Sequence, residues 1–190
     1  MRKGASFRPA LLALALIAAT VAAQARSSWK IDPSQTHVRF WVDAIGWPRT
    51  AGEFKSFEGR IDIDFDTPSR SRVDFRVAAK SVDADSANMD DYLRSEVFFN
   101  VARFPDISFV STSVEKRDEQ HARVTGDLTM LSVTRPISLD VEFARKPANQ
   151  RIGFKATGVI NRLDFGMNAG YPLISDAIHL TVTTEASVET

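Results

Sequence analysis

The sequence contains no cysteine. This absence excludes disulfide bonds, a thiolate nucleophile, an iron–sulfur cluster and any zinc site built from cysteine ligands. The chain also lacks an excess of charge of one sign, because 24 basic residues balance 24 acidic residues. Without a basic surface there is no electrostatic footprint for nucleic acid, and we expect no nucleic-acid partner.

Residue patterns that carry catalysis are equally scarce. The three histidines, His37, His121 and His179, are far apart in the sequence and do not have the spacing of metal ligands. No Gly-x-Ser-x-Gly motif of a hydrolase is present. The acidic run 83–91 superficially suggests a calcium loop, but it lacks the loop glycine, and Arg94 occupies the position of the bidentate acid. We therefore expect no catalytic residue, no metal site and no cofactor.

The only long apolar run lies at the N-terminus. Three basic residues precede apolar residues 10–23, and Ala23-Gln24-Ala25 then fits a small-x-small cleavage site. The run is shorter than the roughly 20 residues that span a bilayer. We expect residues 1–25 to be a cleaved secretory signal peptide. Residues 26–190 then form one exported domain, periplasmic or secreted, with no membrane span after cleavage.

Strict alternation of apolar and polar residues dominates the rest of the chain. It is clearest from Val124 to Met130 and from Ile137 to Phe143, where it predicts two strands of an antiparallel hairpin, each with one buried face. Pro136 cannot donate a ladder hydrogen bond, so we expect it at the start of the second strand.

Further alternating segments predict more strands. They cover residues 29–31, 37–44, 57–65, 73–77, 107–114, 151–160 and 177–188. In the segment 57–65 the alternation places Phe65 on the inner face and Asp64 on the outer face. The stretch 83–100 breaks the pattern, and the four-residue spacing of Met89, Leu93 and Val97 predicts a short helical insertion.

This arrangement predicts an all-β fold. About eight strands with short links form an antiparallel meander, which closes into a barrel or folds into a sandwich. A barrel of about eight strands is either filled by side chains or holds one small ligand. Small inward residues such as Gly126, Ala156 and Gly158 could leave an apolar volume for a ligand or could relieve crowding between strands. The alternation favours neither.

A series of short motifs runs from Trp29 almost to the C-terminus. They are Trp29-Lys30-Ile31-Asp32-Pro33 with His37-Val38-x-Phe40, Gly52-x-Phe54-x-x-Phe57-x-Gly59-x-Ile61, Ser81-Val82-Asp83, Leu93-Arg94-Ser95-x-x-Phe98-Phe99-Asn100, Phe104-Pro105-x-Ile107-x-Phe109-x-Ser111-Thr112, Gly126-Asp127-Leu128-Thr129, Val133-Thr134-x-Pro136 and Asn161-Arg162-x-Asp164-Phe165-Gly166. In this order and spacing, the chain resembles the YceI family of exported, lipocalin-like, polyisoprenoid-binding proteins.

The resemblance implies an extended eight-stranded antiparallel β-barrel with the short helical insertion near the barrel mouth. It also implies that a long isoprenoid or fatty chain occupies the barrel. The chain departs from the family at Ser132, where the family often has glycine. It also departs at residues 89–93, which read Met-Asp-Asp-Tyr-Leu where the family often has Arg-Asp-x-His-Leu. Neither departure touches the apolar tail site.

Strand parity and the resemblance together give candidate ligand-binding residues. The expected apolar lining is Phe40, Phe75, Phe109, Leu128, Met130, Phe154 and Phe165, with Leu93, Phe98 and Phe99 at the mouth. The expected polar end is Asp91, Arg94, Arg162 and Asp164. A one-residue slip inverts the faces of a whole strand, so parity is the sensitive step.

Three functions are compatible with these features. The favoured one is a non-catalytic carrier of a polyisoprenoid or quinone-like lipid. The second is a lipid-modifying enzyme that uses the same cavity and the four polar-end residues. The third is a structural β domain with a filled core that binds partner proteins through Trp41 and Trp47. A homodimer formed through an apolar mouth is also possible.

Overall fold

The computed structural model describes residues 27–146 and 151–188. The predicted signal peptide, residues 1–25, lies outside the described residues. Among the residues that are described, no helix has the length and apolar character needed to cross a bilayer.

Strands make up most of the described chain. They are β1 (Ser27–Ile31), β2 (His37–Ala44), β3 (Trp47–Phe54), β4 (Phe57–Ile63), β5 (Arg72–Ala78), β6 (Val82–Asp83), β7 (Asp106–Lys116), β8 (His121–Met130), β9 (Val133–Lys146), β10 (Arg151–Asn161) and β11 (Ile174–Val188). The helices of the described residues are α1 (Ala87–Arg94) and the short 3-10 helices η1 (Pro33–Gln35), η2 (Pro68–Arg70), η3 (Ala79–Ser81) and η5 (Arg162–Phe165).

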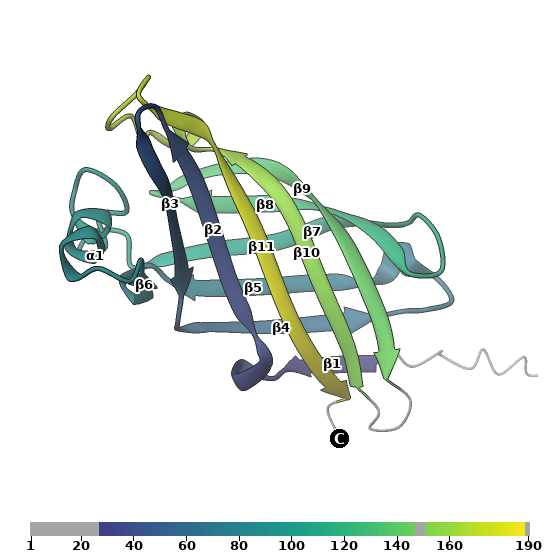
Figure 1. The fold of residues 1–190 in the computed structure, drawn as a ribbon. Helices are drawn as coiled ribbons and strands as arrows, with labels where there is room; N and C mark the ends of the chain where they lie inside the picture. Colours follow the sequence, from purple (N-terminus) through teal and green to yellow (C-terminus); the bar gives the residue numbers. More distant parts are fainter. Residues whose placement is uncertain (1–26, 147–150, 189–190) are drawn as a thin grey trace, which may run out of the picture.

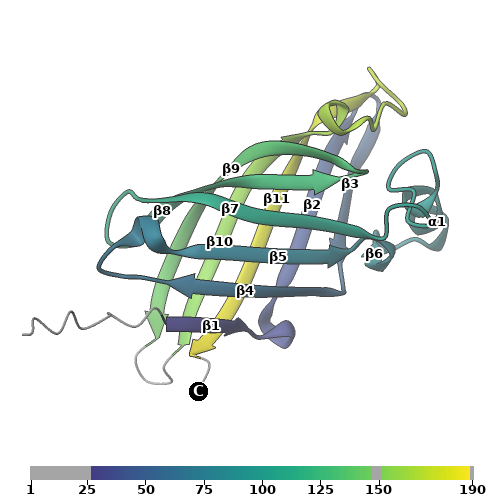
Figure 2. The same ribbon diagram turned by 180° about the vertical axis from the view of Figure 1, so that it is seen from behind.

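The strands form one closed antiparallel barrel (Figures 1 and 2). β11 pairs with β10 on one side and with both β2 and β1 on the other, and the β1–β11 pairing closes the ring. β1 and β2 are consecutive segments of one bent strand. The same holds for β3 with β4 and for β5 with β6. Counting each such pair as one bent strand gives the predicted eight-stranded barrel, which is confirmed.

The two ends of the barrel are built differently. At one end, termed the helix end, α1 lies beside β6, and the β2–β3 turn and the β10–β11 loop lie there too (Figure 1). At the other end, termed the η2 end, lie η2 between β4 and β5 and the turn between β7 and β8 (Figure 2). The predicted helical insertion is confirmed as α1 and the turns that follow it.

Buried aromatic side chains close the helix end. Leu93, Phe98 and Phe99 of the insertion are 6–8% exposed and belong to the main hydrophobic core. Phe99 packs edge-on against Phe54 of β3, with ring centroids 5.5 Å apart. Burying such side chains contributes about 1.5–3 kcal/mol each. The insertion is therefore part of the core, and it plugs the helix end of the barrel.

One prediction about the central hairpin is wrong. Pro136 is not at the start of its strand, because β9 begins at Val133 and Pro136 pairs with Asp127 of β8. The pairing between β9 and β10 begins only at Asp140. At Pro136 the strand is therefore paired on one side only, and an edge position tolerates a residue that lacks an N–H.

The turn of this hairpin generates a testable prediction. Leu131 and Ser132 both have left-handed backbone conformations, with φ of 53° and 63°. This conformation costs a residue with a Cβ about 1–2 kcal/mol, and glycine avoids most of that cost. Ser132→Gly should raise the free energy of unfolding by about 1 kcal/mol, measured by denaturant titration.

The matched control is Ser138→Gly in the extended strand β9, which should lower stability by at least about 0.5–1 kcal/mol. Equal destabilisation by both glycines would contradict the assigned turn geometry.

Candidate functional site

A cavity of about 660 Å³ occupies the barrel interior. Its lining comes from β2 to β5 and β7 to β11 and is overwhelmingly apolar. The polar or charged residues that line it are Asp64, Ser71, Ser108, Lys116, Glu119, Gln120 and Thr184. This size and lining match ligand sites for small molecules rather than a barrel filled by its own side chains.

Most of the expected apolar residues surround this cavity. Those that line it are Phe40, Phe75, Phe99, Phe109, Leu128, Met130 and Phe154. Leu93, Phe98 and Phe165 are buried in the adjoining core instead and are not among the lining residues. That any of these ten residues contacts a ligand stays a prediction.

The inward glycines have a packing role that explains how the cavity stays open. Three aromatic rings lie against glycines of neighbouring strands: Phe40 against Gly52, Phe75 against Gly59 and Phe109 against Gly126. A Cβ added to Gly126 would lie only 2.5 Å from Cζ of Phe109. Each ring can therefore lie close to the barrel wall. The sequence left open whether the small inward residues relieve crowding or leave space for a ligand. Both occur, because the glycines accommodate the aromatic rings and a cavity remains beside them.

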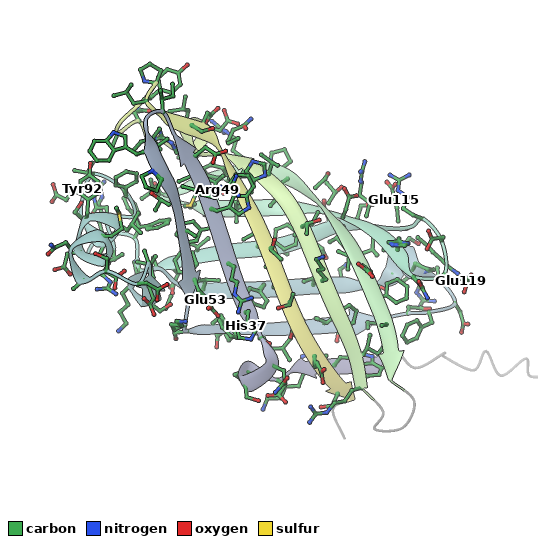
Figure 3. All side chains as sticks on the ribbon, in the orientation of Figure 1. His37, Arg49, Glu53, Tyr92, Glu115 and Glu119 are labelled. Carbon is green, nitrogen blue, oxygen red and sulfur yellow. The ribbon has the colours of Figure 1, made fainter. Side chains whose placement is uncertain are left out.

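Exposure identifies the open end of the cavity. At the helix end the lining residues Phe99 and Met130 are only 7% and 5% exposed. The lining side chains of Lys116 and Glu119, by contrast, are 43% and 91% exposed. Figure 3 shows Glu119 and Tyr92 at opposite ends of the barrel. The cavity is therefore closed where the insertion packs and opens at the η2 end. The expectation that the insertion, with Leu93, Phe98 and Phe99, lies at the mouth is wrong, because these side chains are buried and fill the helix end.

A β-bulge places Lys116 at this opening. The register between β7 and β8 shifts between Ser111 and Ser113. Phe109 and Lys116 would lie on opposite faces of a regular strand, because they are an odd number of residues apart. The extra residue of the bulge reverses the alternation, so both side chains line the cavity. Sequence reasoning missed Lys116 because the predicted strand, 107–114, ended before it and contained no bulge.

Asp64 is a second residue that the alternation misplaced. It was expected on the outer face, but it is 7% exposed and lines the cavity, whereas Phe65 is 39% exposed. The reason is that β4 ends at Ile63, and the chain then turns into η2. Asp64 Oδ1 accepts a hydrogen bond from the Thr67 N–H at 2.7 Å, which holds the carboxylate within this turn.

The four expected polar-end residues do not line the cavity. Arg162 is 1% exposed and donates to three backbone carbonyls, those of Ser175 (2.8 Å), Ile174 (2.9 Å) and Met167. Burial lowers the pKa of Arg162, and the nearby charge of Asp176 opposes that change without cancelling it. Arg162 thus holds the β10–β11 loop together, while Asp164 is exposed to solvent.

The other two polar-end residues belong to the insertion. Arg94 donates to the carbonyls of Lys80 (2.9 Å) and Val82 (2.6 Å), and its guanidinium is 3.6 Å from the carboxylates of Asp90 and Asp91. These contacts join α1 to η3 and β6. The structure therefore does not bring the four residues together at one chemical centre.

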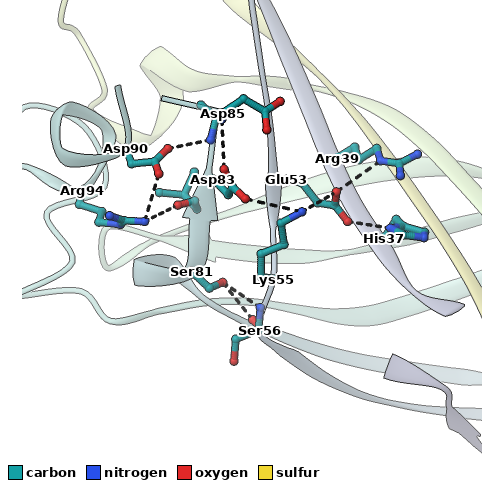
Figure 4. Close-up of polar contacts among 12 residues, drawn as sticks. His37, Arg39, Glu53, Lys55, Ser56, Ser81, Asp83, Asp85, Asp90 and Arg94 are labelled. Atoms are coloured by element: carbon teal, nitrogen blue, oxygen red, sulfur yellow. Dashed lines mark hydrogen bonds and ion pairs between the residues drawn. The ribbon is translucent and has the colours of Figure 1, made fainter. Parts of the chain in front are cut away.

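A charge cluster on β2 and β3 continues this polar network (Figure 4). Glu53 lies 2.7 Å from Nδ1 of His37, 3.1 Å from Nζ of Lys55 and 3.6 Å from Nε of Arg39, and Lys55 also faces Asp83 of β6 at 3.7 Å. Partial burial by itself raises the pKa of Glu53. The hydrogen bonds from His37 and Lys55 and the two cationic charges outweigh it, so the pKa lies below the ordinary 4.5.

Comparison with known proteins adds sequence relatives. A family model described as a YceI-like domain matches residues 29–186. The chain is 33% identical over 178 residues to Protein YceI of Salmonella arizonae, which covers 90% of this chain and 93% of the relative. Protein YceI of Salmonella enteritidis matches to the same extent.

Solved structures share the fold. The YCEI protein of Campylobacter jejuni has a TM-score of 0.70 at 28% identity and covers 78% of this chain and 90% of its own. BcnA of Burkholderia cenocepacia gives a TM-score of 0.77 at 19% identity, covering 83% and 99%. A polyisoprenoid binding domain from Saccharophagus degradans gives 0.67 at 14% identity, covering 87% and 100%. The last two similarities are evidence for the fold alone.

The glycine packing leads to a stability prediction. A Cβ on Gly126 would lie 2.5 Å from the Val110 carbonyl oxygen, a backbone atom that cannot easily move. A Cβ on Gly158 meets mainly the mobile Cδ2 of Leu139, at 2.6 Å. We expect Gly126→Ala to lower the free energy of unfolding by about 1–3 kcal/mol and Gly158→Ala to cost clearly less. Thermal and denaturant unfolding measure both, and a larger loss for Gly158→Ala would be incompatible with this packing.

The charge cluster leads to a pH prediction. Because the folded-state pKa of Glu53 is depressed, its contribution is fully present above pH 4.5 and is lost as the pH falls through the lower folded-state value. Glu53→Gln should cost roughly 1–2 kcal/mol at neutral pH. The stability difference between wild type and variant should shrink below pH 4.5. Denaturant titrations across this pH range measure it.

Glu58→Gln is the control for this series, because the Glu58 side chain is 78% exposed and lies 3.8 Å from Arg76. An exposed pair of this kind contributes little at any pH. A Glu53→Gln difference that stays constant down to acid pH would refute the assigned role of Glu53.

Proposed function

Because the chain belongs to the YceI-like domain family, we propose that it is a non-catalytic protein that carries or sequesters a polyisoprenoid or similar long-chain lipid. The ligand would be a polyprenyl or quinone-like molecule whose tail lies in the barrel. The neighbouring structure from Saccharophagus degradans bears the name of a polyisoprenoid binding domain, which agrees with this class of ligand.

The observation that carries the proposal is the apolar cavity with one open end. A flexible apolar tail gains roughly 25 cal/mol for each Å² of surface removed from water. Ordering the tail offsets part of that gain, so a preformed cavity favours binding. The closed strand pairing holds this cavity in shape. With so few polar groups along the wall, the site would select a tail by its length and girth.

We further propose that the chain is exported by cleavage of residues 1–25 and acts in the periplasm or outside the cell. The family membership and the apolar N-terminal run support this location. The alternative of a lipid-modifying enzyme receives no support from the geometry, since Asp91, Arg94, Arg162 and Asp164 do not line the cavity. The alternative of a filled structural domain conflicts with the cavity volume of about 660 Å³.

The partner-binding alternative relied on two tryptophans. Trp41 stacks on His179 with ring centroids 3.6 Å apart, and the Arg49 guanidinium lies 3.6 Å from the Trp41 ring. Trp41 is thus engaged within the chain, whereas Trp47 is 74% exposed at the helix end. The neighbouring Ile45 and Leu173 are 70% and 57% exposed, and a partner protein for this surface stays a prediction. Dimerisation through the mouth stays a prediction.

Native mass spectrometry of the protein purified from its own host tests the proposed function. We expect a bound lipid at one molecule per chain, identified after organic extraction. A protein that is empty and also fails to take up added polyprenyl lipid would refute the carrier function.

A pair of variants tests whether the lipid lies in the cavity. Ala156 lines the cavity, whereas Thr157 of the same strand faces outward. Ala156→Phe should weaken lipid binding about tenfold or more by filling the space that the tail needs, and Thr157→Phe should leave it unchanged. Lipid titration followed by native mass spectrometry measures both. Equal retention by both variants would place the lipid outside the barrel.

A further inference from the structure

The polar groups of the cavity lining are concentrated at the η2 end. Asp64 and Ser71 flank η2, Lys116 ends β7, and Glu119 and Gln120 come from the turn between β7 and β8. Elsewhere in the described part of the chain, the polar residues that line the cavity are Ser108 and Thr184. An amphiphilic ligand whose tail enters the barrel would therefore leave its polar head at this opening.

Among the residues whose side chains the structure describes, the charges at this opening are compensated. Nζ of Lys116 lies 2.6 Å from Oε1 of Glu119, and Nε of Arg70 lies 3.6 Å from Oδ2 of Asp64. Arg72, on the same side of the barrel, donates to the carbonyls of Ser69 (3.1 Å) and Ser71 (2.7 Å). Of these cationic residues only Lys116 lines the cavity. A diphosphate needs several cationic donors that are free to bind it, and the carboxylates of Glu119 and Asp64 would repel it.

One hydrogen-bond acceptor at this end is unused. Oδ2 of Asp64 is buried and accepts no hydrogen bond from the described residues, although Oδ1 is satisfied by the Thr67 N–H. Leaving a buried acceptor without a hydrogen bond costs about 1–3 kcal/mol, and Nε of Arg70, at 3.6 Å, compensates the charge without donating one. Because the Asp64 side chain lines the cavity, a donor on a ligand at this end would face this carboxylate.

From these observations, and resting on the proposed function, we propose that the ligand's head group lies at the η2 end beside Asp64 and is an uncharged hydrogen-bond donor. A primary alcohol of a polyprenol or a hydroquinone hydroxyl has this chemistry, and a prenyl diphosphate does not. The hydroxyl donates to Asp64, and the neutralised Lys116–Glu119 pair borders the head group without attracting an anion.

Three probes with one shared tail separate these properties: geranylgeraniol, its methyl ether and geranylgeranyl diphosphate. The ether keeps the oxygen but cannot donate, and the diphosphate adds negative charge. Calorimetric or displacement titrations of the exported chain, after removal of bound lipid, should give the alcohol about tenfold tighter binding than the ether. The diphosphate should bind more weakly than the alcohol, with a gap that narrows at high salt.

Variants assign the preference to one residue. Asp64→Asn keeps an acceptor for the Thr67 N–H but replaces the carboxylate, so the preference for the alcohol over the ether should be lost. Asp62→Asn is the control, because Asp62 lies two residues earlier, in β4, does not line the cavity and pairs with Arg60 at 3.2 Å. That variant should keep the wild-type preference. Circular dichroism and the unfolding temperature verify that both variants fold.

The outcomes separate this inference from the function on which it rests. Equal affinity for the alcohol and the ether, or tightest binding of the diphosphate, overturns the head-group assignment while leaving lipid binding intact. Binding of none of the three probes overturns the proposed function and this inference with it. If Asp64→Asn does not fold, the comparison of the three probes on the unchanged protein still decides the matter.

Discussion

The pairing of β1 with β11 is the constraint on which the rest of the structure depends. The pairing places Ile31 opposite Ala186 and joins the first strand of the chain to its last. It closes the ring of strands, so unpaired backbone groups remain only on short stretches such as the start of β9, and not along a whole edge strand as in an open sheet. It also encloses a volume that the inward side chains do not fill. The cavity is thus a consequence of closure combined with large side chains that lie against the wall beside glycines.

Closure leaves two ends, and the chain treats them in opposite ways. At the helix end Leu93, Phe98 and Phe99 complete the core, and Arg94 ties the insertion to neighbouring backbone. At the η2 end Asp64 and Lys116 border an opening. A barrel closed at one end and polar at the other suits an amphiphile that enters tail first. Most of the buried polar contacts hold loops in place, which keeps the middle of the cavity apolar.

Much of this was predictable because alternation reports directly which face of a strand is buried. It identified most of the strands, although not β3 (Trp47–Phe54), and six of the residues that line the cavity, such as Phe40 and Phe109. The closed barrel and the placement of Phe99 followed from the family resemblance. It failed where the backbone departs from regular geometry. The end of β4 at Ile63 reversed the expected side of Asp64, and the bulge beyond Ser111 brought Lys116, which lay beyond the predicted strand, to the cavity. Neither departure has a clear signature in a single sequence.

The sequence by itself determined the class of fold and the apolar character of the interior, because both follow from a two-residue period repeated along most of the chain. It also indicated the family, through short motifs in a characteristic order and spacing. Only the tertiary structure decided which end of the barrel is open and which polar groups border it. The physical reason is that Asp64 and Lys116 come from turns and strands distant in sequence, and their placement depends on how the closed sheet bends. The same holds for Arg162, whose role became visible only with the three carbonyls around it.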